Sequence, residues 1–162
     1  MKNKIKYFLT SFLFLILITN FVSAQSDDQC FKCHLDLDDA KATLFKTDIH
    51  HLKGISCSGC HGGDASSEDM DVAMSKEKGF IGVPSKENRY QVCANCHSDA
   101  DKMKRFGSKL PTDQFEKLKS SIHFQPSYNN KGPMADCITC HSVHDIKRVK
   151  DPTSKVYPTK IT

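Results

Sequence analysis

The stretch Cys93-Ala94-Asn95-Cys96-His97 is the feature that decides how this chain folds. Its two thiols lie three positions apart, about one helical turn, so that both can bond to one flat ligand while the adjacent imidazole lies beneath the ligand's centre. The pattern Cys-x-x-Cys-His occurs four times and uses all eight cysteines. The four copies are Cys30, Cys33 and His34; Cys57, Cys60 and His61; Cys93, Cys96 and His97; and Cys137, Cys140 and His141.

This pattern is the attachment signature of c-type haem, in which the cysteines form thioethers to the porphyrin vinyl groups and the histidine is the proximal iron ligand. We therefore expect four covalently bound haem c groups. The alternatives are structural zinc, which paired Cys-x-x-Cys units can hold, and a disulfide framework of the kind found in exported chains. Neither alternative accounts for the four histidines that follow the cysteines.

Four further histidines, His50, His51, His123 and His144, lie outside the motifs. A second imidazole closes the sixth position of a haem iron and gives a low-potential, low-spin centre suited to electron transfer. We expect His50, His123 and His144 to be such distal ligands. The fourth iron is then open, or closed by His51 or by one of two methionines, Met74 or Met103.

The order of elements repeats once along the chain. A histidine that follows an isoleucine precedes the second motif of each half, as Ile49-His50 and as Ile122-His123. The match favours His50 over its neighbour His51 and predicts two dihaem modules, about residues 25–64 and 85–149, within one domain of residues 25–162. The polar segment 64–79 is expected to link them at the surface.

The N-terminus has the order of a secretory signal. A basic start precedes an apolar run over residues 7–18 and a small-x-small site ending at Ala24. We expect residues 1–24 to be removed on export to the periplasm. An uncleaved anchor would instead tether the protein to the membrane, but the apolar run is shorter than the ~20 residues that a span needs.

Charge narrows the choice of partner. Loss of Lys2, Lys4 and Lys6 with the signal leaves 20 basic and 19 acidic side chains, a net charge of +1. The propionates of four haems, about eight carboxylates, would make the holoprotein acidic. A basic surface for nucleic acid is therefore not expected.

The expected fold class is mainly α, with short helices and loops wrapped around stacked haems and little or no sheet. Helices are predicted over residues 35–46 and 85–106, the second opening with Ser85 as its cap. Another begins at Asp113, where Asp113 and Glu116 have the spacing of a capping box, and leads to His123. Apolar runs are few and Trp is absent, so the haems are expected to fill the interior.

Together these residues resemble the periplasmic multihaem cytochrome c family, which includes tetrahaem electron carriers and haem-rich donors to nitrite reductase. The resemblance rests on the four motifs, on Ser121-Ile122-His123 and on the stretch from Cys140 to Ile146. It implies a haem wire in which His50, His123 and His144 are distal ligands. Chains of this kind often continue into further motifs, so this one is a compact tetrahaem form or part of a longer wire.

The expected function is electron transfer between redox partner proteins, such as a membrane quinol dehydrogenase or a terminal reductase. One alternative is a small reductase or oxidase that acts on a nitrogen oxyanion, hydroxylamine or peroxide at an open haem. For such a site the sequence offers Arg89, Tyr90, Arg105 and Tyr128, although side chains of these types more often lie at the surface or contact haem propionates. No motif has Lys in place of its His, the substitution that marks the catalytic haem of the nitrite reductases that the chain resembles. A second alternative is a membrane-tethered quinol-oxidising subunit, which requires residues 1–24 to remain.

Overall fold

The computed structural model describes residues 28–126 and 132–160, and the expected signal segment, Tyr128 and the two C-terminal residues lie outside this part. The described chain folds into short helices joined by loops, without a strand; one isolated bridge joins Pro126 to Pro133. The mainly α fold is therefore confirmed. The elements are α2 (Gln29–Asp36), α3 (Ala40–Phe45), α4 (Ile49–Leu52), α5 (Ser58–His61), α6 (Met70–Ala73), η1 (Lys76–Lys78), α7 (Arg89–His97), α8 (Ala100–Arg105), α9 (Gln114–Lys119), η2 (Ile122–Phe124), α10 (Cys137–His141) and η3 (Pro158–Lys160).

Aspartates keep the helices short by starting new ones. The expected helix 35–46 is interrupted at Asp38, which has φ +55°, and Asp39 caps α3 through the Lys41 N–H. The expected helix 85–106 is likewise two helices, because Asp99 ends the turn after α7 and caps α8. A side chain that accepts backbone N–H bonds favours a new helix start over continuation. The sequence pattern predicted helix in both regions but misplaced the helix ends. The predicted Ser85 cap is wrong, because α7 begins at Arg89 after Asn88.

The segment that carries His123 also differs from its prediction. Asp113 precedes α9 but caps no N–H group; its carboxylate pairs with Lys117, 2.7 Å away, and Glu116 pairs with Lys119. The predicted capping box is therefore wrong, because lysines about one turn further along the chain bind both carboxylates in place of backbone N–H groups. His123 lies beyond α9, in the short 3-10 helix η2.

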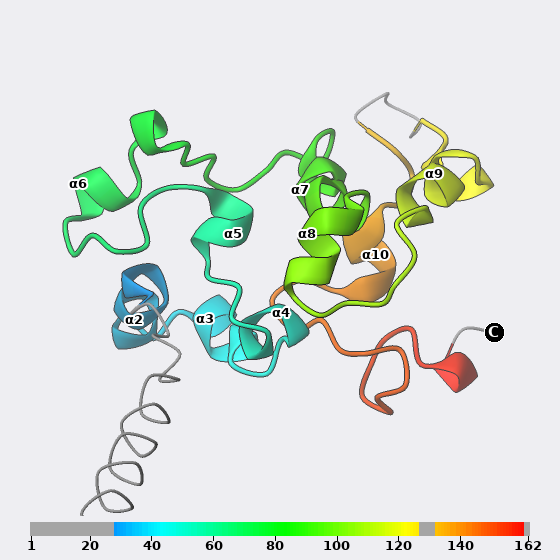
Figure 1. The fold of residues 1–162 in the computed structure, drawn as a ribbon, viewed down its shortest axis with the longest axis horizontal. Coiled ribbons are helices and arrows are strands. Elements are labelled where there is room, and N and C mark those ends of the chain that lie inside the picture. Colours follow the sequence, from blue (N-terminus) through cyan, green and yellow to red (C-terminus); the bar gives the residue numbers. More distant parts are fainter. Residues whose placement is uncertain (1–27, 127–131, 161–162) are drawn as a thin grey trace, which may run out of the picture.

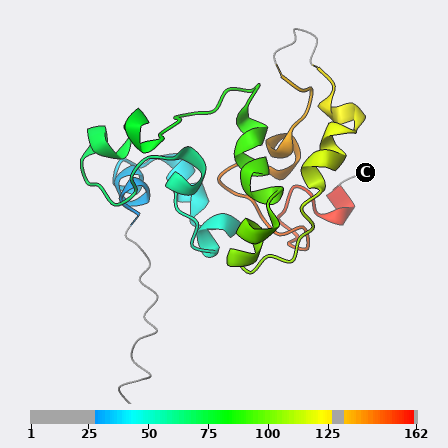
Figure 2. The ribbon, with the colours of Figure 1, turned by 45° about the horizontal axis from the view of Figure 1, so that its top comes forward.

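The four motif helices follow one another across the molecule. Figure 1 shows α2, α5, α7 and α10 in sequence from the N-terminal end of the fold to the C-terminal end, and the turned view in Figure 2 preserves this order. Helix α5 packs on α7, and α7 packs on α10. The order in space is therefore the order in the sequence.

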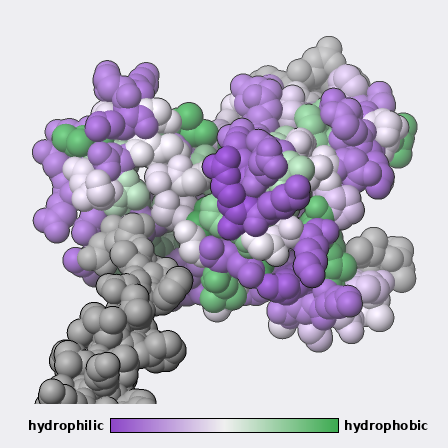
Figure 3. All heavy atoms as spheres, viewed as in Figure 1, coloured by the Kyte–Doolittle hydropathy of each residue, from purple (hydrophilic) through white to green (hydrophobic). Residues whose placement is uncertain are grey.

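The polypeptide alone has almost no core. Among the described residues the buried apolar side chains are Ala42, Phe45 and Met103, whereas fourteen large apolar side chains are exposed. Figure 3 shows such apolar residues scattered between hydrophilic ones on one face. A domain of this size normally buries far more apolar surface, so a large apolar group must complete its interior.

Residues 64–84 fold back onto the second motif. Backbone bonds join Gly63 N to Lys78 O, Asp64 N to Ala73 O, and Ile81 N to His61 O. Gly62 has φ +69°, and a Cβ there would lie 2.0 Å from the Gly79 carbonyl oxygen. Although most of its side chains are exposed, this segment fixes the backbone around His61.

Candidate haem-binding site

Each motif lies on or beside a helix that presents its cysteines. The first, third and fourth motifs lie within α2, α7 and α10, and in the second motif Cys57 is the residue before α5. Side chains three positions apart on a helix share one face. All eight cysteines are free thiols. Burial, helped by the carboxylate of Asp28, raises the pKa of the Cys57 thiol to about 12, so this thiol is protonated at neutral pH.

Cysteines of successive motifs lie close together. The Asp28 carboxylate, which caps α2, accepts the N–H of Cys57 at 2.8 Å and so joins the first motif to the second. Cys60 is a near neighbour of Cys96, and Cys93 is a near neighbour of Cys137. The attachment points therefore form a continuous row from the first motif to the fourth.

Hydrogen bonds to Nδ1 orient three of the imidazoles. His61 Nδ1 lies 2.8 Å from the Gly82 carbonyl oxygen, His34 Nδ1 lies 2.9 Å from Asp39, and His50 Nδ1 lies 2.9 Å from Asp48. Since one ring nitrogen is engaged, Nε2 remains free to bind a metal. This is the arrangement in which metal-binding histidines are normally held.

Two pairs of imidazoles have the separation that a shared iron requires. The ring centres of His61 and His144 are 6.0 Å apart, and those of His50 and His97 are also 6.0 Å apart. Two metal–nitrogen bonds of about 2 Å, with a ring centre about 1 Å behind each nitrogen, give about 6 Å between the centres. The ring planes are 18° apart in the first pair and 81° apart in the second. Each pair combines a motif histidine with an expected distal ligand.

Three of the histidines are kept neutral. Burial lowers the pKa of His97, His141 and His144, and neighbouring imidazoles lower it further for His97 and His144. A neutral imidazole is the form that binds iron. These positions therefore suit ligands at neutral pH.

A groove of about 920 Å³ runs between α5 and α7. Cys60 and Gly59 of the second motif form part of its wall, and Gln91, Val92 and Asn95 of α7 line the other side. The volume is within the range of cofactor sites. Together with the free thiols, the paired imidazoles and the missing core, the groove shows that the residues fit c-type haem.

His51 and His123 lie in different surroundings. The His51 ring is 4.7 Å from Phe31 of the first motif and 5.2 Å from Phe45. His123 is exposed, and its carbonyl accepts the Ala135 N–H just before the fourth motif. In the described part of the chain, neither ring is paired with a motif histidine at the spacing of the two pairs above. Of the methionine alternatives, Met74 is exposed and Met103 is buried.

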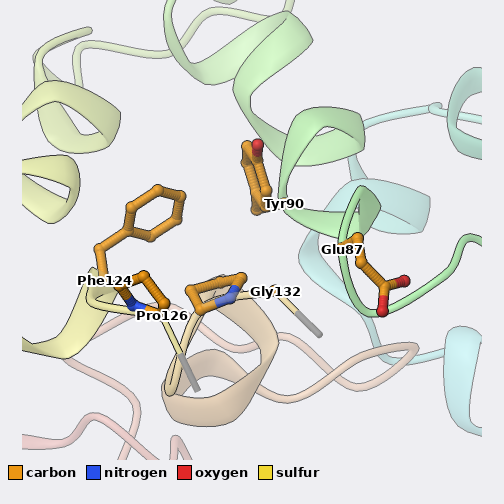
Figure 4. A pocket seen from close by; sticks show the side chains of 6 residues that line it. Glu87, Tyr90, Phe124, Pro126 and Gly132 are labelled. Carbon is orange, nitrogen blue, oxygen red and sulfur yellow. The ribbon is translucent and has the colours of Figure 1, made fainter. Parts of the chain in front are cut away.

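An aromatic cluster supports the segment that contains His123. Tyr90 of α7 stacks on Phe115 of α9 at 5.3 Å and meets Phe124 of η2 edge-on at 5.1 Å. Tyr90 and Phe124 also line a cavity of about 310 Å³, shown from close by in Figure 4. Tyr90, one of the side chains considered for an open haem, is therefore part of a packed aromatic cluster.

Comparison with protein families agrees with this geometry. Residues 49–155, more than half of the chain, match the family described as cytochrome c3. The chain belongs to the cytochrome c3 family. Residues 17–62 also match the family described as cytochrome c554 and c-prime, so together the matches cover all four motifs. No curated protein and no solved structure matches the chain.

Membership of the cytochrome c3 family makes this chain a multihaem c-type cytochrome that transfers electrons between redox partners. Its haem is of the c type and is covalently bound. Cytochromes of these families are typically periplasmic. None of the helices in the described residues is long and apolar enough to cross a membrane.

Sequence reasoning missed the aspartates that support the site. Four helices of the site begin at an aspartate cap. Asp28 and Asp136 cap the helices of the first and fourth motifs, Asp39 caps the helix after the first motif, and Asp48 caps the helix that carries His50. Their positions carried a signal, because an aspartate followed within three residues by a helix start predicts an N-cap. The additional bonds, which Asp39 accepts from His34 Nδ1 and Asp48 accepts from His50 Nδ1, could be found only in the folded structure.

Proposed function

We propose that this cytochrome is a periplasmic carrier with four haems, attached in sequence order along one row and exchanging electrons with separate donor and acceptor proteins. The row of motif cysteines supports this proposal, since it would place neighbouring haems close together. In this proposal Cys30 and Cys33 hold the first haem, Cys57 and Cys60 the second, Cys93 and Cys96 the third, and Cys137 and Cys140 the fourth.

The two imidazole pairs are the observation on which the proposal chiefly depends. We propose that His61 and His144 ligate the second haem iron and that His97 and His50 ligate the third. Both assignments join residues of the first half to residues of the second. Iron bound in this way has no position for a substrate and changes only its oxidation state.

The first and fourth haems would lie at the ends of the row, with His34 and His141 as proximal ligands. His51, beside Phe31, is the nearby candidate for the first iron, and His123, in the segment before α10, for the fourth. Both motif histidines keep a large exposed surface in the polypeptide, although neighbouring groups partly desolvate the His141 ring. The end haems are therefore the natural points for electrons to enter and leave.

We also propose how this cytochrome is exported and matured. Residues 1–24 would direct export and be removed after Ala24, and haem attachment would follow in the periplasm. A membrane quinol dehydrogenase is a suitable donor and a terminal reductase a suitable acceptor, which extends the resemblance to the donors of nitrite reductase.

A redox titration of the purified holoprotein tests the proposal. Mass spectrometry should give four haems on a chain that starts at Gln25, and the titration should take up four electrons per chain. Nitrite, hydroxylamine and peroxide should not be consumed catalytically by the reduced protein. Fewer than four haems, or turnover of any of these substrates, would contradict the carrier proposal.

A further inference from the structure

Asp48 has the most completely buried large side chain in the described part of the chain, with 1% of its surface exposed. Its Oδ1 accepts the His50 backbone N–H at 2.8 Å and lies 2.9 Å from His50 Nδ1. Its Oδ2 accepts the Ile146 N–H at 2.7 Å. Two backbone N–H groups and one imidazole nitrogen therefore surround a side chain that is otherwise closed off from water, and such donors favour the carboxylate form.

The bond to Ile146 is part of a seam between two distant segments. Ile49 N donates to Ile146 O at 2.9 Å, and Lys147 Nζ donates to Thr47 O at 2.8 Å. Residues 47–49 are therefore tied to residues 145–147, and Ile146 lies two positions after His144. One carboxylate thus contacts the His50 ring directly and fixes the backbone that presents His144.

A buried carboxylate has two effects on an imidazole to which it is hydrogen-bonded. It fixes the tautomer and the orientation of the ring, and it makes the opposite nitrogen a stronger electron donor. A stronger donor stabilises the ferric state of a haem iron and lowers its reduction potential. The low exposure of Asp48 strengthens both effects, because water screens the charge poorly.

We propose that Asp48 is a positioning residue that sets the ring orientation and lowers the reduction potential of the haem ligated by His50 and His97, and that holds the neighbouring ligand His144 through Ile146. The inference rests on the ligand pairs proposed above. It assigns to this buried carboxylate a tuning role beyond the capping of α4.

Asp48→Asn tests the proposal, with Asp145→Asn as the matched control. Asp145 lies in the same seam, where its carboxylate contacts Thr47 and Lys147 and, among the described residues, no histidine. Both variants remove one negative charge, but Asp48→Asn also weakens the bond to the His50 ring. The readouts are the midpoint potential of each haem and the electron paramagnetic resonance spectrum of the oxidised holoprotein.

We expect Asp48→Asn to raise the potential of the haem with near-perpendicular imidazole planes, to alter its low-spin signal, and to change the near-parallel signal less. Asp145→Asn should leave both signals in place and shift the potentials less. Equal effects of the two variants would overturn the proposal, because removal of a charge alone would then explain the result.

A measurement on the unaltered holoprotein covers the case in which Asp48→Asn does not mature. The Nδ1 proton of His50 should exchange slowly with solvent, because its acceptor is buried; rapid exchange would overturn the proposal. The spectrum of the unaltered holoprotein also distinguishes failure of the proposed ligand pairs from failure of the proposed role of Asp48. If it lacks a near-perpendicular bis-histidine signal, the proposed ligand pairs fail. If it has the signal but the two variants behave alike, only the role of Asp48 fails.

Discussion

Ser142 occupies a backbone conformation that its side chain disfavours. Its φ of 74° and ψ of −174° nearly match those of Gly62, at 69° and −161°, and each residue directly follows the histidine of its motif. This region of backbone space is almost confined to glycine. The chain therefore makes the same turn after its second and fourth motifs, and at the fourth it does so with strain.

Replacing Ser142 by glycine should relieve this strain. We expect Ser142→Gly to raise the free energy of unfolding of the holoprotein by about 1 kcal/mol, measured by denaturant titration. Ser98→Gly is the matched control, because Ser98 follows the third motif with an ordinary φ of −105°. This variant should be less stable than the unaltered protein, since glycine relieves no strain there and adds freedom to the unfolded chain. A loss of stability in both variants would show that Ser142 is not strained.

Adjacent histidines at positions 50 and 51 have different predicted roles. His50→Ala should abolish the near-perpendicular low-spin signal and produce a haem that binds carbon monoxide after reduction, since the His50 ring centre lies 6.0 Å from that of His97. His51→Ala should leave that signal intact, because the His51 ring packs against Phe31 and Phe45 instead. Loss of the same signal in His51→Ala would reverse the assignment.

At the scale of elements, the start of α10 depends on one buried aspartate. Asp136, 3% exposed, forms a capping box with Thr139 and an ion pair with Arg89 at the start of α7. Burial alone would raise the pKa of Asp136, but the bonds from Arg89 and Thr139 lower it overall. The same side chain therefore caps the fourth motif helix and fixes it to the third.

Asp136→Ala should destabilise the holoprotein by about 1 to 2 kcal/mol at neutral pH, from loss of the cap alone. Because the folded pKa is depressed, the ionised group stabilises the fold above its unfolded pKa of about 4, and this stabilisation is lost as pH falls through the folded pKa. The difference between Asp136→Ala and the unaltered protein in denaturant titrations should therefore shrink below about pH 4.

The exposed Asp113 provides the control, since in the described part of the chain its carboxylate forms an ion pair with Lys117 and caps no helix. Asp113→Ala should change stability little at any pH. A difference for Asp136→Ala that stays constant down to pH 3 would contradict the predicted role of its charge.

Sequence reasoning recovered the motifs and the class of fold because both depend on local spacing. The cysteine positions and the Ile-His repeat are visible in the chain itself, and each motif does form on or beside a helix. Helix ends were predicted less well, because Asp39 and Asp99 act as caps within runs of good helix formers. The pairing of His144 with His61 and the seam from Asp48 to Ile146 join residues more than 80 positions apart, which no local pattern specifies.

At the scale of the whole molecule, the two halves of the polypeptide that hold the row of motifs have net charges of opposite sign. Residues 28–84 contain 10 acidic and 6 basic side chains, a net charge of −4, whereas residues 85–162 contain 8 acidic and 14 basic, a net charge of +6. The first two motifs lie in the negative part and the last two in the positive part. A partner of one charge would therefore approach a particular end of the haem row.

Adsorption on charged electrodes tests this division. The holoprotein should bind a carboxylate-terminated surface through residues 85–160, and binding should weaken above about 0.1 M salt, where the screening length falls to about 10 Å. Charge reversal at Lys104 and Arg105 of α8 should weaken this binding far more than reversal at Lys53 and Lys76. Equal weakening by the two double variants would mean that the net charge, and not its distribution, controls docking.

Electron paramagnetic resonance of the oxidised holoprotein, followed by reduction and addition of carbon monoxide, tests whether two haems are held by imidazole pairs that span both halves of the chain. We expect two distinct bis-histidine low-spin signals, one near-parallel from His61 and His144 and one near-perpendicular from His50 and His97, and no carbon monoxide binding at either haem. Predominantly high-spin iron, or low-spin signals that persist in both His50→Ala and His144→Ala, would contradict it.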